Sequence, residues 1–427
     1  MDLLDLITLP TRSLRALCRV PDDLDSVTSC GAEVPSRELG LPQACVEETW
    51  ERVRKLYRTG LYPGIQVCVR REGRVVLHRA LGHARGNAPG RDAEESATPL
   101  DVETPFTLFS ASKPVTAMLV HKLDEQGVLR LDDRVCQYVP EFAAHGKAEI
   151  TLRHVLAHRA GIAQVPPEVM NLDLLADSEA FLAALCEAKP TSKAGRWLAY
   201  HAVSGGFVLR AVVERATGLD LRVVLDREIR QPLGMRWFSY GADSGDVAQV
   251  AENAFTGFPP LPPVSLLIQR VLGMELREAV ALSNDPRFFD EAIPSVNVVA
   301  TALELSRFYQ CLLDEGLWEE RRVFEPRTVH HAVAEQSFLE IDFTLGLPLR
   351  YGLGFMLGGR NLSLYGPDTP EAFGHVGLTN ILSWADPERR IAAAILTSGK
   401  PFVDLDVLRV FQVASAIGRS FPKLAAR

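Results

Sequence analysis

The segment FTLFSASKPVTAML, residues 106–119, combines an apolar run with two chemically reactive side chains. Ser110 and Lys113 stand three residues apart where the apolar run begins. In a helix, side chains at positions i and i+3 share a face, so the lysine amine can reach the serine hydroxyl. A serine becomes a good nucleophile when a neighbouring base takes its proton, and burial can lower a lysine pKa enough for that task. The structural alternative is that Ser110 caps a helix and Lys113 is solvated.

Length, charge and cysteine usage restrict the class of protein. A chain of 427 residues suits one large domain or two closely packed ones. The formal net charge of −8 and the lack of a Lys/Arg cluster argue against nucleic acid as a partner. The seven cysteines are scattered without CxxC or Cys/His spacing, so the sequence predicts no disulfide framework, metal site or other cofactor. This pattern is typical of a reducing compartment and predicts a cytoplasmic protein.

The N-terminal stretch MDLLDLITLPTRSLRALCRV, residues 1–20, is apolar but unlike a signal peptide. Asp2 and Asp5 occupy the region that is positive in secretory signals, and Pro10 interrupts the run. No window reaches the roughly 20 apolar residues that a membrane span requires. We expect an amphipathic helix packed on its own domain, and a peripheral membrane contact remains the alternative.

The periodicity along the chain predicts strands at both ends and helices between them. Residues 64–82 form a β-hairpin pattern around REGR, and residues 381–398 form a second one around DPERR. The further expected elements are a polar loop over 84–100, a strand over 352–358, and helices over 45–59, 112–127, 151–158, 203–217, 220–230, 298–316 and 403–418. The order predicts a mixed α/β fold in which distant segments assemble one sheet, with a cleft beside the helical insertion.

Two further short motifs lie where an element begins or ends. In LAYHAVSGG, residues 198–206, Tyr200 precedes a small-residue turn, and a nearby Lys113 charge would lower its pKa for proton transfer. In FGHVGLTNILSWADP, residues 373–387, His375 and Gly377 open a strand whose N–H groups can face a developing oxyanion. The structural alternatives are a tyrosine packed in the core and a surface histidine before a strand.

Taken together and in this order, the three motifs resemble those of the β-lactamase and penicillin-binding-protein superfamily of serine hydrolases. The family signature is SxxK, Tyr-x-Asn, and Lys-Thr-Gly or His-x-Gly. In this chain it reads Ser110-Ala-Ser-Lys113, Tyr200-His-Ala202 and His375-Val-Gly377. The resemblance is strongest to the carboxylesterases related to class C β-lactamases, the class VIII type, and it extends over about residues 46–420.

The resemblance implies a fold and its division. We expect a β-lactamase/transpeptidase-like antiparallel sheet flanked by helices, with a mostly helical inserted subdomain. The sheet subdomain would comprise about 46–105 and 330–427, and the helical subdomain about 106–329. Residues 1–45 would be an N-terminal extension to the hydrolase domain of residues 46–427.

The resemblance also implies roles for single residues. Ser110 would attack a carbonyl and become the acyl-enzyme, while Lys113 and Tyr200 would share the general-base and general-acid work. The backbone N–H groups of Ser110 and Leu378 would form the oxyanion hole. His375 would hydrogen-bond Tyr200 or polarise the site. Gly377 and Ala202 would contact the substrate.

Two departures from the family signature favour an ester over an amide as the small-molecule substrate. His375 is largely neutral at pH 7, whereas the lysine of Lys-Thr-Gly offers a cation to the carboxylate of penicillin-like substrates. Ala202 replaces an asparagine amide that can hydrogen-bond a substrate amide. The alternatives are an amide-cleaving β-lactamase, D-alanyl carboxypeptidase or D-aminopeptidase, and a non-catalytic scaffold.

Other candidate motifs point to structure. No GxSxG elbow of an α/β-hydrolase occurs in the chain. His154 and His158 have the i, i+4 spacing of metal ligands but lack the glutamate of HExxH, so we interpret them as structural. FPPLPP, residues 258–263, can be a partner-binding polyproline segment or a rigid cleft wall. The apolar run 264–274 behind it is a candidate wall or lid for an acyl chain.

Overall fold

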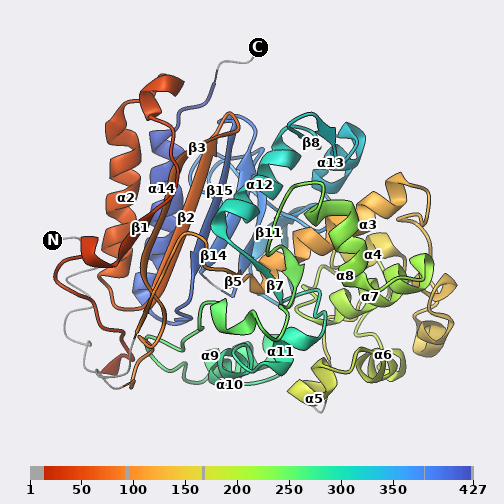
Figure 1. The fold of residues 1–427 in the computed structure, drawn as a ribbon. Helices are drawn as coiled ribbons and strands as arrows, with labels where there is room; N and C mark the ends of the chain where they lie inside the picture. Colours follow the sequence, from red (N-terminus) through yellow and green to blue (C-terminus); the bar gives the residue numbers. More distant parts are fainter. Residues whose placement is uncertain (1–13, 92–96, 166–168, 379, 425–427) are drawn as a thin grey trace.

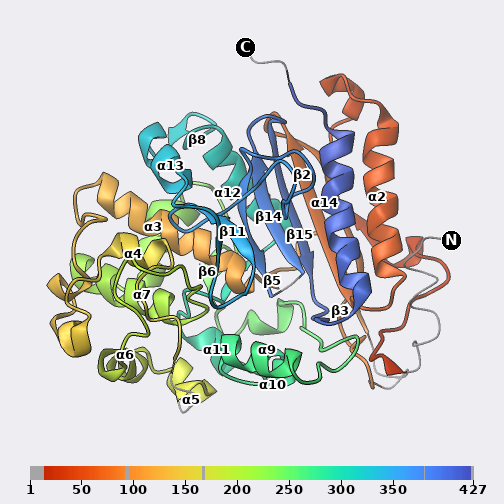
Figure 2. The same ribbon diagram turned by 180° about the vertical axis from the view of Figure 1, so that it is seen from behind.

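The computed structural model describes residues 14–91, 97–165, 169–378 and 380–424 of the chain. A large antiparallel sheet carries two long helices on one face and a mostly helical lobe on the other side (Figure 1; Figure 2). The strand order in this sheet is β1-β3-β2-β15-β14-β13-β12-β11-β10, and β4 pairs with β3. The strands are β1 (Thr28–Cys30), β2 (Gly64–Arg71), β3 (Arg74–Arg85), β4 (Thr98–Pro99), β10 (Ser337–Ile341), β11 (Pro348–Tyr351), β12 (Met356–Leu357), β13 (Phe373–Gly377), β14 (Ile381–Asp386) and β15 (Ile391–Thr397).

The sheet joins the two ends of the chain. Strand β2 pairs with β15 in the register Ile65↔Thr397 to Arg71↔Ile391, so the first and last predicted hairpins lie side by side. Every residue of β2, β14 and β15 is buried, because helices cover both faces. The predicted assembly of one sheet from distant segments is therefore confirmed.

Two layers of helices enclose this sheet. Helices α2 (Gln43–Tyr57) and α14 (Leu408–Ser420) pack on one face (Figure 2). Helix α12 (Ala302–Leu313) packs against β15, β14 and β2. The amphipathic pattern read for residues 45–59 therefore matches a helix with one apolar stripe against the sheet.

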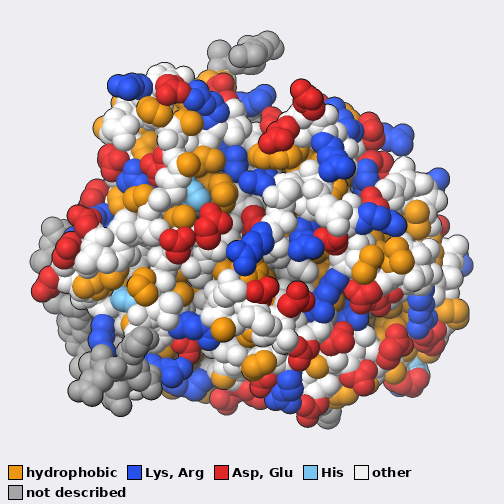
Figure 3. All heavy atoms as spheres, in the orientation of Figure 1, with side chains coloured by type: hydrophobic (Ala, Val, Ile, Leu, Met, Phe, Trp, Pro, Cys, Tyr) orange, Lys and Arg blue, Asp and Glu red, His pale blue; other side chains and the backbone are white. Residues whose placement is uncertain are grey.

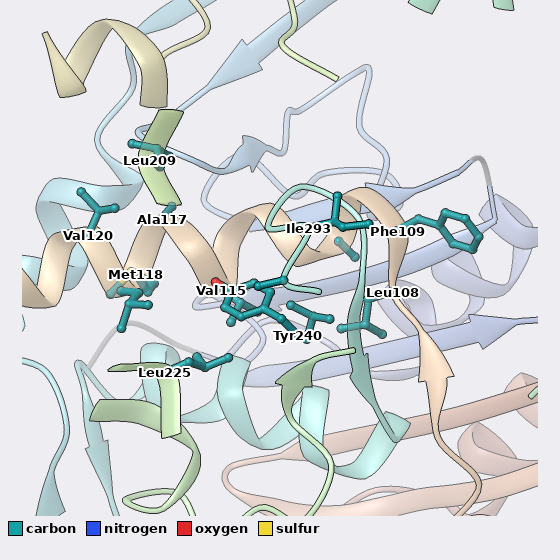
Figure 4. Close-up of a cluster of buried hydrophobic side chains, with 14 of the residues drawn as sticks. Leu108, Phe109, Val115, Ala117, Met118, Val120, Leu209, Leu225, Tyr240 and Ile293 are labelled. Atoms are coloured by element: carbon teal, nitrogen blue, oxygen red, sulfur yellow. The ribbon is translucent and has the colours of Figure 1, made fainter. Parts of the chain in front are cut away.

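Helix α3 (Lys113–Glu125) lies at the centre of the helical lobe. Its residues Lys113–His121 and Leu123 are all buried, and the polar side chains of Lys113, Thr116 and His121 are among them. Figure 4 shows Val115, Met118 and Val120 of this helix among apolar side chains of neighbouring elements. Because α3 is packed all round, its first residues are held rigidly where the lobe meets the sheet.

The helical lobe contains short helices and two small sheets. Besides α3 and α12 its helices are α4 (Leu152–Leu156), α5 (Leu172–Leu175), α6 (Ser178–Glu187), α7 (Ser204–Thr217), α8 (Leu221–Leu225), α9 (Val264–Leu272), α10 (Leu276–Leu282), α11 (Arg287–Asp290) and α13 (Pro326–Val333). Strands β5 (Phe106–Thr107), β7 (Val298–Ala300) and β6 (Ser239–Tyr240) form one small sheet, and β8 (Leu317–Trp318) pairs with β9 (Arg321–Arg322).

Several element boundaries differ from the sequence prediction. The strand expected over 352–358 is only Met356–Leu357, and the α-helix expected over 403–418 is Leu408–Ser420. The helix expected over 298–316 begins only at Ala302, because Val298–Ala300 pairs as a strand and Thr301 caps the helix with Glu304 in a capping box. The helix expected over 220–230 ends at Leu225 and continues as a π-turn over Asp226–Arg230. At Val298–Ala300, strand pairing overrides the local 3.6-residue pattern.

The described residues that precede α2 contact the large sheet and the loop at Gly257. Strand β1 pairs with β3, and buried Arg15 forms ion pairs with Asp404 at 2.6 Å and Asp406 at 2.7 Å. Most of the helix predicted near residues 1–20 lies outside the described residues. None of the described helices has the length and apolarity needed to cross a bilayer. Acidic and basic side chains intermingle over the face shown in Figure 3.

Candidate active site

Ser110 and Lys113 meet at the junction of two kinds of helix. Ser110 lies in a 3₁₀ turn, Phe109–Ser112, and Lys113 is the first residue of α3, with Pro114 directly behind it. Side chains at i and i+3 eclipse one another in a 3₁₀ turn, which brings the Lys113 Nζ to 3.1 Å from the Ser110 Oγ. The structure thus replaces the expected α-helical pair by a tighter geometry.

The backbone around the serine is strained. Phe109 adopts a positive φ of 47°, in the left-handed region that non-glycine residues rarely occupy. Such a conformation costs roughly 1–3 kcal/mol and persists only where surrounding packing imposes it. It turns the chain sharply so that Ser110 is partly exposed at the start of a buried helix.

The Lys113 amine is buried and has three oxygen neighbours. Besides the Ser110 Oγ, the Nζ donates to the carbonyl of Ala202 at 2.8 Å and to that of Ser295 at 3.3 Å. Neither carbonyl carries a formal charge, and burial lowers the Lys113 pKa from 10.5 to about 7. A substantial fraction of the amine is therefore neutral near pH 7 and can accept a proton.

Tyr200 is buried beside this pair. The Lys113 Nζ lies 4.8 Å from the centroid of the Tyr200 ring, and the phenol hydrogen-bonds with the Ser110 hydroxyl. The sequence predicted that the lysine would lower the Tyr200 pKa, and this was wrong. Burial raises the pKa of Tyr200 well above 10, and the hydrogen bond with Ser110 only partly opposes that effect. The phenol therefore carries its proton at neutral pH.

His375 stands beside Tyr200 as a neutral ring. The two ring centroids are 6.1 Å apart, and among the described residues no hydrogen bond joins these side chains. The His375 Nδ1 lies 2.8 Å from the Val376 carbonyl, which can only accept, so Nδ1 carries the proton of the neutral imidazole. Burial, with the nearby Lys113 charge, lowers the His375 pKa to about 3. A permanent cation is therefore not available from this position.

The end of β13 packs tightly against the turn that carries Ser110. A Cβ at Gly377 would lie 2.2 Å from the Leu108 carbonyl oxygen and 3.3 Å from the Ala111 nitrogen, so only glycine allows this approach. Leu378, the next residue, has a positive φ of 30°. Leu378 and Ser110 both belong to the lining of one apolar cavity.

An apolar cavity of about 310 Å³ opens at Ser110. Ser110 and Tyr200 are the polar side chains in its described lining, which also includes Ala202. The remaining lining side chains are Phe109, Val203, Leu267, Ile268, Val271, Leu272, Val296, Leu345, Leu347, Leu349, Met356, Leu364, Val376, Leu378 and Phe402. The apolar run that follows FPPLPP is helix α9, and four of its residues form one wall of the cavity, as the sequence suggested.

The structure adds Asp342, which the sequence did not single out. This buried carboxylate accepts the backbone N–H of Tyr200 at 3.1 Å and the N–H groups of Thr344 and Leu345 at 2.8 and 3.0 Å. It also accepts the Tyr351 hydroxyl at 3.1 Å. Asp342 therefore connects the Tyr200 loop to the segment that forms another cavity wall. It stands in no recognisable motif.

The histidines of HVLAH have structural contacts. His154 Nδ1 lies 3.1 Å from the Thr151 nitrogen in a helix cap, and His158 Nδ1 accepts the backbone N–H of His201 at 3.2 Å. The His158 ring also packs on Tyr200, with centroids 4.8 Å apart. Within the described residues, no group of His, Cys, Asp and Glu side chains has a metal-binding arrangement.

The fold and the arrangement of the three motifs define the family. The chain belongs to the Beta-lactamase family, whose family model matches residues 45–416. The resemblance drawn from the motifs is therefore confirmed for family and fold.

Three proteins of known name or structure show what this chain is similar to. The chain is 28% identical over 316 residues to the esterase/beta-lactamase LipL of Mycobacterium tuberculosis, with 70% of each chain covered. It is 27% identical to a penicillin-binding-protein homologue from Caulobacter crescentus, with a TM-score of 0.76 and 92% and 100% of the two chains covered. A family VIII carboxylesterase structure shares the fold at 24% identity, with a TM-score of 0.75 and coverage of 91% and 99%.

Proposed function

We propose that this protein is a serine hydrolase that cleaves carboxylic esters through an acyl-enzyme on Ser110. The contacts of Lys113 carry this proposal. A neutral amine has two N–H donors and one lone pair, and two of its three oxygen neighbours are the carbonyls of Ala202 and Ser295. When both N–H groups bind these carbonyls, the lone pair is directed at the Ser110 hydroxyl 3.1 Å away.

Lys113 is accordingly the base in the first step. Ser110 Oγ attacks the ester carbonyl, its proton passes to the Lys113 Nζ, and the carbonyl π-electrons move to oxygen. Tyr200 cannot take this proton in the free enzyme, because its phenol is already protonated at neutral pH. It donates instead: the phenol proton passes to the departing alkoxide and is replaced from the Lys113 ammonium. The ester C–O bond breaks and the alcohol leaves.

The tetrahedral intermediate needs donors for its oxyanion. We assign the backbone N–H groups of Ser110 and Leu378 to this task, since the contact at Gly377 brings their segments together. Loss of one oxyanion donor typically costs about 3 kcal/mol of transition-state stabilisation. Water then attacks the acyl-enzyme, and its proton passes to the Tyr200 oxygen as the phenol proton moves to the neutral Lys113 amine. The Lys113 ammonium returns a proton to the Ser110 Oγ as the bond between Oγ and the acyl carbon breaks, and the carboxylic acid leaves.

The lining of the cavity supports an ester over a β-lactam. A β-lactam carries a carboxylate, whereas no Lys, Arg or protonated His belongs to the described lining. Burying an unpaired carboxylate in such surroundings is unfavourable. Ala202 presents a methyl group to the cavity where an asparagine amide would offer hydrogen bonds. Among the relatives, LipL is named an esterase/beta-lactamase, which covers both activities, and EstB of Burkholderia gladioli is named an esterase.

Parallel turnover of p-nitrophenyl butyrate and a chromogenic cephalosporin tests the proposal. We expect hydrolysis of the ester with at least 100-fold lower kcat/KM for the cephalosporin. Ser110→Ala should abolish ester turnover while changing the free energy of unfolding by less than about 1 kcal/mol. Rapid cephalosporin hydrolysis with idle esters would assign an amide-cleaving enzyme. A folded wild-type protein that turns over neither substrate would favour the scaffold.

A further inference from the structure

The cavity at Ser110 has the size and chemistry of a site for a hydrocarbon chain. Apart from Ser110 and Tyr200, its described lining consists of hydrophobic side chains. One wall is the inner face of α9, with Leu267, Ile268 and Val271. The facing wall is the segment behind Asp342, with Leu345 and Leu347.

The volume indicates how long a chain fits. An apolar cavity of about 150 Å³ accommodates benzene, with its six carbons. The cavity at Ser110 is about 310 Å³, close to twice that volume. By this comparison it holds a chain of roughly 8–12 carbons. Shorter acyl groups leave part of it unfilled, and much longer ones extend beyond it.

The two steps of the reaction indicate which half of the ester occupies the cavity. The acyl group stays covalently attached to Ser110 while the alcohol leaves and water enters. An apolar cavity that includes Ser110 in its lining therefore suits the acyl half, which must stay bound through both steps. Position 202 also lines the cavity, so a methyl group, not an amide, faces the chain.

We propose that the cavity between α9 and the segment 345–349 is an acyl-chain site that selects uncharged, medium-length acyl groups, with Leu267 as a specificity-determining residue. This inference rests on the proposed ester hydrolysis. Leu267 lines the cavity and its side chain is also 44% exposed to solvent, so it can be replaced without opening the core. The described lining contains no cation that could pair with a carboxylate at the far end of an acyl chain.

The test is a chain-length series of p-nitrophenyl esters from acetate to palmitate, assayed below their aggregation concentrations. Burying one methylene raises kcat/KM by up to roughly fourfold. We expect kcat/KM to rise from acetate to a maximum between octanoate and laurate, and to fall at palmitate. The mono-p-nitrophenyl ester of suberic acid, which has the length of octanoate and a terminal carboxylate, should react at least 100-fold more slowly than octanoate.

Leu267→Asn and Leu266→Asn form a matched pair on α9. Leu266 is 60% exposed and does not line the cavity, whereas Leu267 is 44% exposed and does. Leu267→Asn should lower the octanoate-to-acetate ratio of kcat/KM at least tenfold, and Leu266→Asn should leave that ratio unchanged. Thermal melting checks that both fold, and Leu267→Ala replaces the asparagine variant if it does not.

The outcomes separate the two proposals. Acetate hydrolysis that depends on Ser110, together with a flat or falling profile up to octanoate, overturns the acyl-chain site and leaves the esterase intact. Equal reaction of the octanoate and suberate esters also overturns it. Absence of any ester turnover by folded wild-type protein overturns the proposed function, and the acyl-chain site with it.

Discussion

The buried amine of Lys113 makes the stability of the folded protein depend on pH in a defined window. Its pKa falls from 10.5 to about 7 on folding. That difference of about 3.5 units, at about 1.4 kcal/mol each, means that the protonated amine destabilises the native state by roughly 5 kcal/mol. Between about pH 7 and pH 10.5 the unfolded chain holds a proton that the native protein has released. Stability therefore rises with pH across this window and is independent of this group outside it.

Urea unfolding of the wild type and Lys113→Met at a series of pH values measures this effect. Methionine has a similar unbranched shape and no titratable group, so other ionisations largely cancel in the difference. From pH 6 to pH 9 the difference in free energy of unfolding should move in favour of the wild type by roughly 2.5 kcal/mol. A difference that stays constant over this range would refute the lowered pKa and the assignment of Lys113 as the base.

Lys400 provides a matched control. Its amine is also buried, donates to the Thr397 carbonyl at 2.6 Å and has its pKa lowered to about 7 by burial. Lys400→Met should therefore remove a similar pH-dependent contribution to stability.

In the wild type kcat/KM should fall about tenfold per pH unit below about pH 6 and level off above about pH 8, because the neutral amine of Lys113 is the active form. Lys400→Met should keep this inflection near pH 7. If the inflection disappears in Lys400→Met, it belongs to Lys400 and not to Lys113.

Three other substitutions probe the site. Asp342→Ala removes the acceptor of the Tyr200 N–H and should lower kcat at least tenfold and the free energy of unfolding by roughly 2–4 kcal/mol. Asp342→Asn should recover most of the lost kcat and most of the lost stability. Equal losses in the two variants would contradict the role of Asp342 in positioning Tyr200. Gly377→Ala places a Cβ 2.2 Å from the Leu108 carbonyl oxygen and should lower the free energy of unfolding by roughly 1–3 kcal/mol. The same variant should also lower kcat, which steady-state kinetics measures. An unchanged kcat would show that the end of β13 does not contribute to the oxyanion site. Ala202→Asn introduces an amide into the apolar wall and should lower the octanoate-to-acetate ratio of kcat/KM at least fivefold; an unchanged ratio would place the chain elsewhere.

The sequence pattern predicted those parts of the fold and site that are formed by residues close together in the chain. The spacing of Ser110 and Lys113 placed a hydroxyl and an amine together, and packing changed only the type of helix that does so. The two hairpins were predicted from the alternation of apolar and polar residues. Strand β2 of the first hairpin pairs with strand β15 of the second. These features depend on neighbours within a few residues, which a single sequence shows directly.

The properties that depend on distant contacts were not predicted. The raised pKa of Tyr200 is a consequence of burial by many elements, so the charge of Lys113 alone suggested the wrong direction. The Ser295 carbonyl that holds the lysine has no side-chain signal, because every residue has a carbonyl. Asp342 is remote in sequence from Tyr200 and looks like an ordinary loop aspartate.

Covalent labelling of Ser110 tests the central claim most directly. The wild-type protein is treated with a fluorophosphonate and digested, and the adduct is located by mass spectrometry. We expect one adduct, on the peptide that contains Ser110, absent in Ser110→Ala and formed at least 100-fold more slowly in Lys113→Met. An adduct that persists in Ser110→Ala, or that forms at the wild-type rate in Lys113→Met, would contradict a serine activated by the neighbouring amine.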